Sequence, residues 1–214
     1  MKPNEDLATS LRRWYDSDRG RAIWRIEANC AFSIYKPKMG EMVIDIGCGT
    51  GQFSRELIER GARVVGIDTD RGVIDDARSL DDHGLYRVMD MHELDYPDNY
   101  FDAAVSTFAL EFSDDPATVI HEAIRVVKPG GDILFGTIQR GSAYADAYAR
   151  RGEAGEIPYA QAHFYTTAEL LAMIPKDVVS VAECIWFGPN DAVTEEVSEN
   201  VAGVVFVAWK KSIG

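Results

Sequence analysis

Short apolar runs alternate with amphipathic stretches along most of the chain. The apolar runs are rich in valine and isoleucine, which is typical of strands buried between two layers of helices. The predicted strands cover residues 42–46, 63–67, 85–89, 99–106 and 132–137. The stretches between them carry apolar residues at helical spacing, and helices are predicted at 52–60, from Asp70 and from Asp115. This alternation predicts an α/β domain with a parallel sheet.

The pattern changes beyond the fifth strand. Thr166 and Glu169 have the spacing of a capping box and predict the start of a helix through Leu170. Two apolar strands follow, at 178–187 and 203–210, and no strong helical pattern lies between them. They predict an antiparallel C-terminal hairpin. The expected fold class is therefore α/β, with a Rossmann-like, mostly parallel sheet of seven strands and helices on both faces.

Two segments lie outside this alternation. Residues 1–40 predict two helices, the second at 21–35, which form an N-terminal cap. Residues 139–165 leave the sheet pattern, carry a predicted helix at 142–151, and follow the carboxyl end of a parallel strand, where ligands bind in open α/β sheets. We expect this insertion to act as a lid. The length of 214 residues and a 46% hydrophobic content suit one domain, residues 1–214.

The first strand ends in three glycines at alternate positions. Gly47, Gly49 and Gly51 allow a tight turn and let a ligand approach the main chain without Cβ atoms in the way. The helix that follows presents free N–H groups to this loop. Asp45 interrupts the apolar strand, and because an unpaired buried charge costs several kcal/mol, we expect it at the rim of the strand and facing a partner.

An acidic residue also ends the second strand. Asp68 lies about twenty residues after the glycine loop, where a carboxylate commonly binds ribose hydroxyls. One carboxylate accepts hydrogen bonds from both hydroxyls at once, so this position indicates an adenosine-type ligand better than the glycines do. The alternative is an ordinary strand–helix turn, in which Asp70 caps the next helix.

The runs VIDIGCGTG, at 43–51, and VVGIDTD, at 64–70, resemble the first two motifs of the class I S-adenosylmethionine-dependent methyltransferases of the small-molecule type. The stretch RVVKPGGDILF is similar to the same family, and the resemblance is dense over 35–137. It implies S-adenosylmethionine as the cofactor. Asp45 and the glycine loop would then hold its methionine end, and Asp68 its ribose.

The resemblance also assigns the remaining cofactor contacts. Asp90 is expected to accept from the adenine amino group and Met91 to pack on the adenine face, whereas Thr69 replaces a larger apolar residue and leaves one side of that slot less tightly packed. Trp14 or Tyr15 is expected near the methionine end, although Trp14 could equally be a core residue. The expected cofactor-binding residues are Tyr15, Asp45, Gly47, Cys48, Gly49, Gly51, Phe53, Asp68, Thr69, Asp90, Met91, Ser106 and Phe108.

The methyl acceptor is less well defined. A formal net charge of −13 disfavours nucleic acid, which needs a basic surface, and favours a small or cationic molecule. The stretch after the fourth strand lacks the Asn/Asp-Pro-Pro motif of enzymes that methylate amide or base nitrogens. A general base is needed only for an acceptor that arrives protonated, and Glu111, His163 and Tyr165 are candidates by position alone. Glu27 could face either the site or the solvent.

Compartment and metal content follow from the remaining residues. Cys30, Cys48 and Cys184 are widely spaced and indicate neither disulfides nor a metal site. No signal peptide or membrane span is expected, so the interpretation is a cytoplasmic protein without a membrane partner, of unspecified oligomeric state. Two other functions remain open: a non-catalytic S-adenosylmethionine-binding protein, and an NAD-dependent oxidoreductase, against which the glycine spacing counts.

Overall fold

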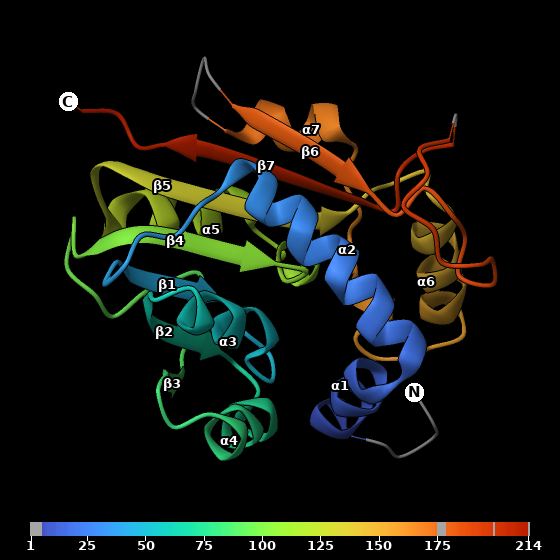
Figure 1. Ribbon diagram of the computed structural model, residues 1–214, viewed down its shortest axis with the longest axis horizontal. Helices are drawn as coiled ribbons and strands as arrows, with labels where there is room; N and C mark the ends of the chain where they lie inside the picture. Colours follow the sequence, from blue (N-terminus) through green and yellow to red (C-terminus); the bar gives the residue numbers. More distant parts are fainter. Residues whose placement is uncertain (1–5, 175–178, 199, 214) are drawn as a thin grey trace.

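The computed structural model describes residues 6–174, 179–198 and 200–213. Within them lies a seven-stranded sheet of order β3-β2-β1-β4-β5-β7-β6 (Figure 1). Strand β7 runs antiparallel to both β5 and β6, and the other pairs are parallel. The predicted fold class is confirmed. The strands are β1 Met42–Ile46, β2 Arg63–Asp68, β3 Leu85–Val88, β4 Phe101–Thr107, β5 Val127–Ile138, β6 Ser180–Cys184 and β7 Val204–Lys210.

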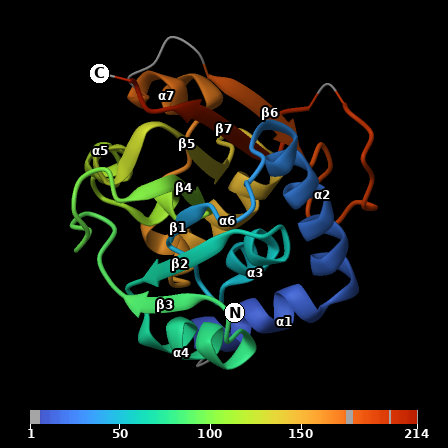
Figure 2. The same cartoon turned by 60° about the vertical axis from the view of Figure 1, so that its left-hand side comes forward.

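Side chains of the central strands point alternately into two separate hydrophobic cores, one on each face of the sheet. On one face, Val43 and Val105 pack with α2 and α3; on the other, Ile44 and Phe135 pack with α5 and α7. Figure 2 shows α2 and α3 on one side of the sheet and α5 and α7 on the other. Each strand is therefore apolar on both sides, as its composition predicts. The helices are α1 Leu7–Asp16, α2 Asp18–Ile34, α3 Gln52–Glu59, α4 Arg71–Leu80, α5 Pro116–Val126, α6 Ala143–Glu153 and α7 Thr167–Met173. Among the helices of the described residues, none combines the length and apolar character of a membrane span.

Two strands differ from their predicted ranges. β5 begins at Val127, opposite Phe101, but the register then jumps to Asp132 opposite Ala103, so the Lys-Pro-Gly-Gly stretch bulges out of the ladder. Pro129 has no N–H to donate, which favours such a bulge. β6 ends at Cys184 because Ile185 takes a left-handed φ of 63°. Val178, the predicted first residue of that strand, lies outside the described residues.

The N-terminal helices form the predicted cap. Ser17 joins them: its hydroxyl donates to Trp14 O at 2.7 Å and accepts from Gly20 N at 2.9 Å, so α2 begins at Asp18, three residues before its predicted start. Arg12 forms an ion pair with the buried Asp76 of α4, which fastens α1 across the sheet. Figure 1 shows α1, α2 and α6 gathered at the end of the sheet to which β4 points.

The insertion at 139–165 is attached at its two ends and through the buried Tyr144, whose hydroxyl accepts from Arg19 at 3.2 Å and whose ring meets Phe187 edge to face at 6.4 Å. Arg140 N donates to Tyr165 O at 2.9 Å, and His163 N donates to Glu111 O at 2.7 Å. Between these ties, α6 packs against the short helix η2 Tyr159–Gln161. The segment therefore forms a loop of its own over the edge of the sheet.

Candidate active site

A cavity of about 890 Å³ lies at the carboxyl edge of the sheet. The segments that follow β3, β2, β1, β4 and β5 line it in that spatial order, and the cap and the insertion close it from outside. The strand order reverses between β1 and β4, the switch point at which ligands bind in open α/β sheets. The loops after β1, β2 and β3 therefore make one half of the cavity. The cap, α6, Ile138 and Val204 make the other.

The glycine loop takes a backbone conformation that only glycine adopts without strain. Gly47, Gly49 and Gly51 have φ values of 73°, 53° and 77°. A Cβ atom on Gly47 would lie 2.2 Å from Ala109 Cβ, and one on Gly51 would lie 3.0 Å from the Tyr86 hydroxyl. Gly47 and Gly49 line the cavity, whereas Gly51 packs beneath it. The glycines thus have two roles: Gly47 and Gly49 form part of the cavity wall, and Gly51 lets the residues beneath it pack closely.

Asp45 lies under this loop rather than at the rim of its strand. It is fully buried, and Ser54 Oγ donates to its Oδ2 at 2.6 Å while Oδ1 has no partner among the described residues. Burial raises its pKa to about 7. Asp45 thus faces a partner, as expected, but it does not lie at the rim, because the first turn of α3 covers the side chain. A direct contact between Asp45 and the cofactor stays a prediction.

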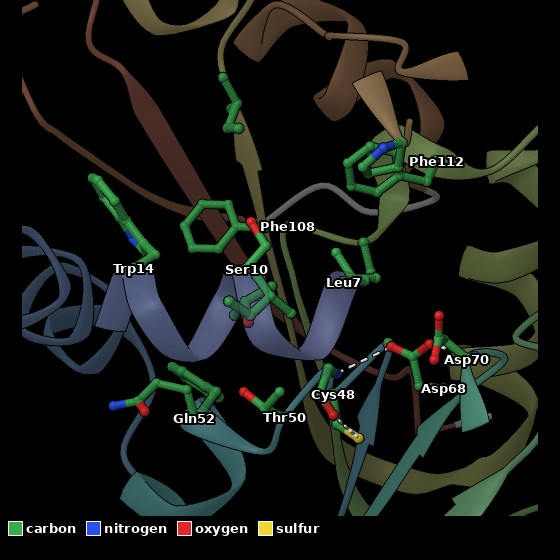
Figure 3. A pocket seen from close by; sticks show the side chains of 18 of the residues that line it. Leu7, Ser10, Trp14, Cys48, Thr50, Gln52, Asp68, Asp70, Phe108 and Phe112 are labelled. Atoms are coloured by element: carbon green, nitrogen blue, oxygen red, sulfur yellow. Dashed lines mark hydrogen bonds between the residues drawn. The ribbon is translucent and has the colours of Figure 1, made fainter. Parts of the chain in front are cut away.

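Asp68 stands on the cavity wall and fixes the glycine loop. Gly49 N donates to its Oδ2 at 3.0 Å, and Asp70 N donates to its Oδ1 at 2.9 Å. Burial raises the pKa of Asp68, and these backbone donors oppose that rise. Each oxygen keeps lone-pair capacity for a further donor. Figure 3 shows Asp68 and Asp70 beside the loop that carries Cys48 and Thr50, with α1 passing over it.

A second carboxylate, Asp90, lines the same half of the cavity. Its Oδ1 accepts from His92 N at 2.9 Å and lies 2.7 Å from His92 Nδ1, and hydrogen bonding to His92 holds the pKa of Asp90 below its usual value. His92 Nε2 is in turn 2.7 Å from Ser113 Oγ. Sequence analysis did not assign a role to His92, although its position two residues after Asp90 allows this turn.

The other half of the cavity is aromatic. Tyr148 stacks on Tyr159 with ring centroids 4.6 Å apart, and Tyr144 lies 6.5 Å from Tyr148. Tyr15 meets Trp24 edge to face at 5.8 Å. All five line the cavity together with Glu27 of α2. The role of Tyr144 and Tyr148 was missed, although their spacing of four residues on a predicted helix places them on one face.

Ten of the thirteen expected cofactor-binding residues line the cavity: Tyr15, Gly47, Cys48, Gly49, Phe53, Asp68, Thr69, Asp90, Met91 and Phe108. The other three, Asp45, Gly51 and Ser106, lie beneath it. Ser106 Oγ donates to Ile46 O at 2.9 Å and ties β4 to β1. What each residue contacts when a ligand is bound stays a prediction.

The structure does not place the three candidate bases on the cavity wall. His163 is exposed, and Tyr165 is partly buried against the core cluster that contains Leu170 of α7. Glu111 is fully buried: Ile138 N donates to its Oε1 at 2.7 Å, and Oε2 has no partner among the described residues. Burial raises its pKa to about 7. On this geometry, Glu111 supports the end of β5 instead of acting on a ligand.

This support predicts a difference between two variants. Glu111→Ala leaves Ile138 N–H without an acceptor and should lower the free energy of unfolding at pH 5 by about 1–3 kcal/mol. Glu111→Gln keeps an oxygen that accepts from Ile138 N–H. It also removes the carboxyl group, whose raised pKa means that ionisation destabilises the folded state. Wild-type stability should therefore fall as pH rises from 4.5 through 7, and the glutamine variant should lose less. Urea unfolding at pH 5 and pH 8 measures the free energy of unfolding of each protein. An equal loss between the two pH values in wild type and Glu111→Gln would contradict this assignment.

The sequence is similar to that of known methyltransferases. Residues 44–135 match the model of the methyltransferase domain family. A malonyl-[acyl-carrier protein] O-methyltransferase of Serratia marcescens is 39% identical over 103 residues, which cover 48% of this chain and 40% of that protein. An uncharacterised protein of Mycobacterium tuberculosis is 33% identical over 164 residues, covering 76% of this chain and 55% of that protein. The chain spans about half the length of the curated relatives it matches.

Among solved structures, the fold matches a Thermotoga maritima protein described as an S-adenosylmethionine-dependent methyltransferase, possible histamine N-methyltransferase. The TM-score is 0.81 at 22% sequence identity, and the match covers 96% of each chain. At this identity the likeness shows a shared fold. It extends over the cap and the insertion as well as the sheet.

Proposed function

The chain belongs to the class I S-adenosylmethionine-dependent methyltransferase family, and we propose that it binds S-adenosylmethionine in this cavity and transfers its methyl group to a small molecule. The observation that carries the proposal is the pairing of Asp68 with the glycine loop, where a carboxylate on the cavity wall holds Gly49 N–H at 3.0 Å. A carboxylate that could accept hydrogen bonds from ribose hydroxyls therefore lies beside a stretch of main chain that a ligand could approach closely.

The residues present fit this cofactor. Asp68 retains acceptor capacity for two hydroxyls, Asp90 and Met91 line the same cavity and would hold the adenine, and the left-handed glycines add no side chains of their own to the loop. When bound, S-adenosylmethionine supplies an electrophilic methyl group on a sulfonium. The chain supplies alignment and excludes water, and alignment alone is worth roughly 7–11 kcal/mol in well-oriented reactions.

The acceptor would occupy the aromatic half of the cavity. This half is built by the cap and by the insertion, which lie outside the stretch 44–135 that matches the methyltransferase domain model. The oxygen acceptor named for the Serratia marcescens relative therefore does not carry over to these walls. A volume of about 890 Å³ for the whole cavity suits the cofactor together with a compact acceptor.

The test is a transfer assay with cofactor labelled in the methyl group and pools of metabolites as acceptors. Label should appear in an organic product that depends on the protein. Retention of all label in the cofactor, by a protein that binds it tightly, would support the alternative of a binding protein without catalysis.

We further propose that residues 139–165 act as a lid on the acceptor. The segment is tied to the rest of the chain at its ends and through Tyr144, whereas the backbone hydrogen bonds described for residues 154–162 stay within the segment. Tyr144, Tyr148 and Tyr159 line the cavity. Without ligand, amides between 152 and 163 should exchange at least roughly tenfold faster than those of β4 and β5, because few interactions oppose local opening. Hydrogen exchange measures this. Protection equal to that of the core strands in the unliganded protein would exclude a lid.

A further inference from the structure

Glu27 lies inside the cavity with nothing in the described chain to pair with it. It sits on the inner side of α2, between Trp24 and Ala28, which are both buried. Across residues 6–174, 179–198 and 200–213, no hydrogen bond or ion pair reaches its carboxyl group. An inward carboxyl group without a partner is costly, so its position indicates a ligand that compensates it.

Aromatic side chains line the cavity that contains Glu27. Tyr15 of α1 and Tyr144 and Tyr148 of α6 belong to its wall, and each of the three lies within reach of the electrostatic effect of the Glu27 charge. Aromatic faces attract cations, by about 0.5–1 kcal/mol at exposed sites and more where water is excluded. A carboxyl group among aromatic rings is the arrangement that recognises an ammonium group.

The arginines near these rings are committed to other partners. Arg151 lies over the Tyr159 ring at 4.2 Å and pairs with Glu156 at 3.0 Å. Arg19 donates to the Tyr144 hydroxyl at 3.2 Å and to the Gly188 carbonyl at 3.0 Å. Neither neutralises Glu27. A ligand that carries a positive charge would therefore compensate the Glu27 carboxylate.

We propose that the methyl acceptor is a small amine, protonated in solution, whose ammonium group pairs with the Glu27 carboxylate among Tyr15, Tyr144 and Tyr148. This inference rests on the proposed methyl transfer and deepens it by naming the acceptor class and the residue that recognises it. It also assigns the base that Glu111, His163 and Tyr165 do not supply from their positions.

The proton balance of the step is simple. An N–H bond of the ammonium breaks, the proton moves to a Glu27 oxygen, and nitrogen keeps the electron pair. That pair forms the new bond to the methyl carbon, while the electrons of the carbon–sulfur bond remain on sulfur, and the methylated nitrogen leaves with the positive charge. Burial raises the pKa of Glu27 to about 8 in the cavity without ligand, which is closer than that of a free carboxyl group to the value of about 10 for alkylamines.

The experiment compares matched ligands in the protein loaded with S-adenosylhomocysteine. The probes are 2-phenylethylamine, cyclohexylmethylamine and butylamine, each paired with the alcohol of the same carbon skeleton, titrated by calorimetry into wild type, Glu27→Gln and Glu59→Gln. Glu59 is an exposed residue at the end of α3, so its variant controls for the change in net charge. Thermal unfolding confirms that each variant is folded, and the Glu27→Asp variant tests whether a shortened carboxylate restores part of the binding.

At least one amine should bind wild type and Glu59→Gln at least about tenfold more tightly than its alcohol, and Glu27→Gln should lose that preference while binding S-adenosylhomocysteine normally. Three outcomes would overturn the amine assignment alone, provided that S-adenosylhomocysteine binds normally. Wild type could bind no amine, it could bind amine and alcohol equally well, or Glu27→Gln could keep the same preference for the amine. Failure of all three proteins to bind S-adenosylhomocysteine would instead overturn the proposed function.

Discussion

Asp68→Ala should weaken the binding of S-adenosylhomocysteine by at least about a hundredfold. If Asp68 holds the ribose as proposed, the variant loses two charge-assisted hydrogen bonds to it, each worth about 1.5–3 kcal/mol, and every 1.4 kcal/mol corresponds to about a factor of ten in affinity. It also loses the acceptor that holds Gly49 N–H at 3.0 Å, so the glycine loop is no longer fixed against the ligand. Titration calorimetry measures the change directly.

The neighbouring carboxylate provides the control. Asp70 caps α4 by accepting from Gly72 N at 2.7 Å and Val73 N at 3.1 Å, so Asp70→Ala should cost about 1 kcal/mol of stability while affinity stays near the wild-type value. Asp68→Asn should fall between wild type and Asp68→Ala because it keeps one oxygen without the charge. Unchanged affinity in Asp68→Ala would mean that the ribose binds elsewhere.

Gly47→Ala should lower the free energy of unfolding by about 2–5 kcal/mol. Its φ of 73° costs an alanine about 1–2 kcal/mol, and a Cβ atom 2.2 Å from Ala109 Cβ adds an overpacking cost of about 1–3 kcal/mol. Gly40→Ala is the matched control, because Gly40 has a φ of 75° with no atom within 4 Å of an added Cβ. Gly40→Ala should lose only the stability that the positive φ costs an alanine, about 1–2 kcal/mol.

Urea unfolding of the two variants separates strain from packing. The loss in Gly47→Ala should exceed that in Gly40→Ala by the overpacking cost, and only Gly47→Ala should also lose affinity for S-adenosylhomocysteine. Equal losses would show that Ala109 moves aside, and that the tight contact between the loops after β1 and β4 does not shape the site.

The cofactor half of the cavity was predictable because local patterns and one topological rule determine it. β1 and β2 pair in parallel, with Ile46 opposite Ile67, so the residues that follow each strand meet at the same edge. The glycine spacing and Asp68 could therefore be brought together from sequence alone. Asp45 was misplaced because its burial depends on how α3 folds back over the strand, which the strand pattern does not encode.

The acceptor half was not predictable in the same way. The cap is positioned by long-range contacts such as the ion pair between Arg12 and Asp76, 64 residues apart. Whether Glu27 faced solvent or the cavity depended on the rotation of α2 about its axis, which the position of Ile23 on the same helix did not settle. Candidate bases chosen by position failed for a related reason: η1 Leu110–Phe112 turns Glu111 inward beneath the cavity.

Calorimetric titration of the wild-type protein with S-adenosylhomocysteine and, separately, with NAD measures whether this cavity is a site for S-adenosylmethionine. S-adenosylhomocysteine should bind one per chain, and NAD should bind about a hundredfold more weakly or not at all, because the loop after β1 and Asp68 are arranged for a compact adenosine ligand. Tighter binding of NAD than of S-adenosylhomocysteine would show that the cavity is not a site for S-adenosylmethionine.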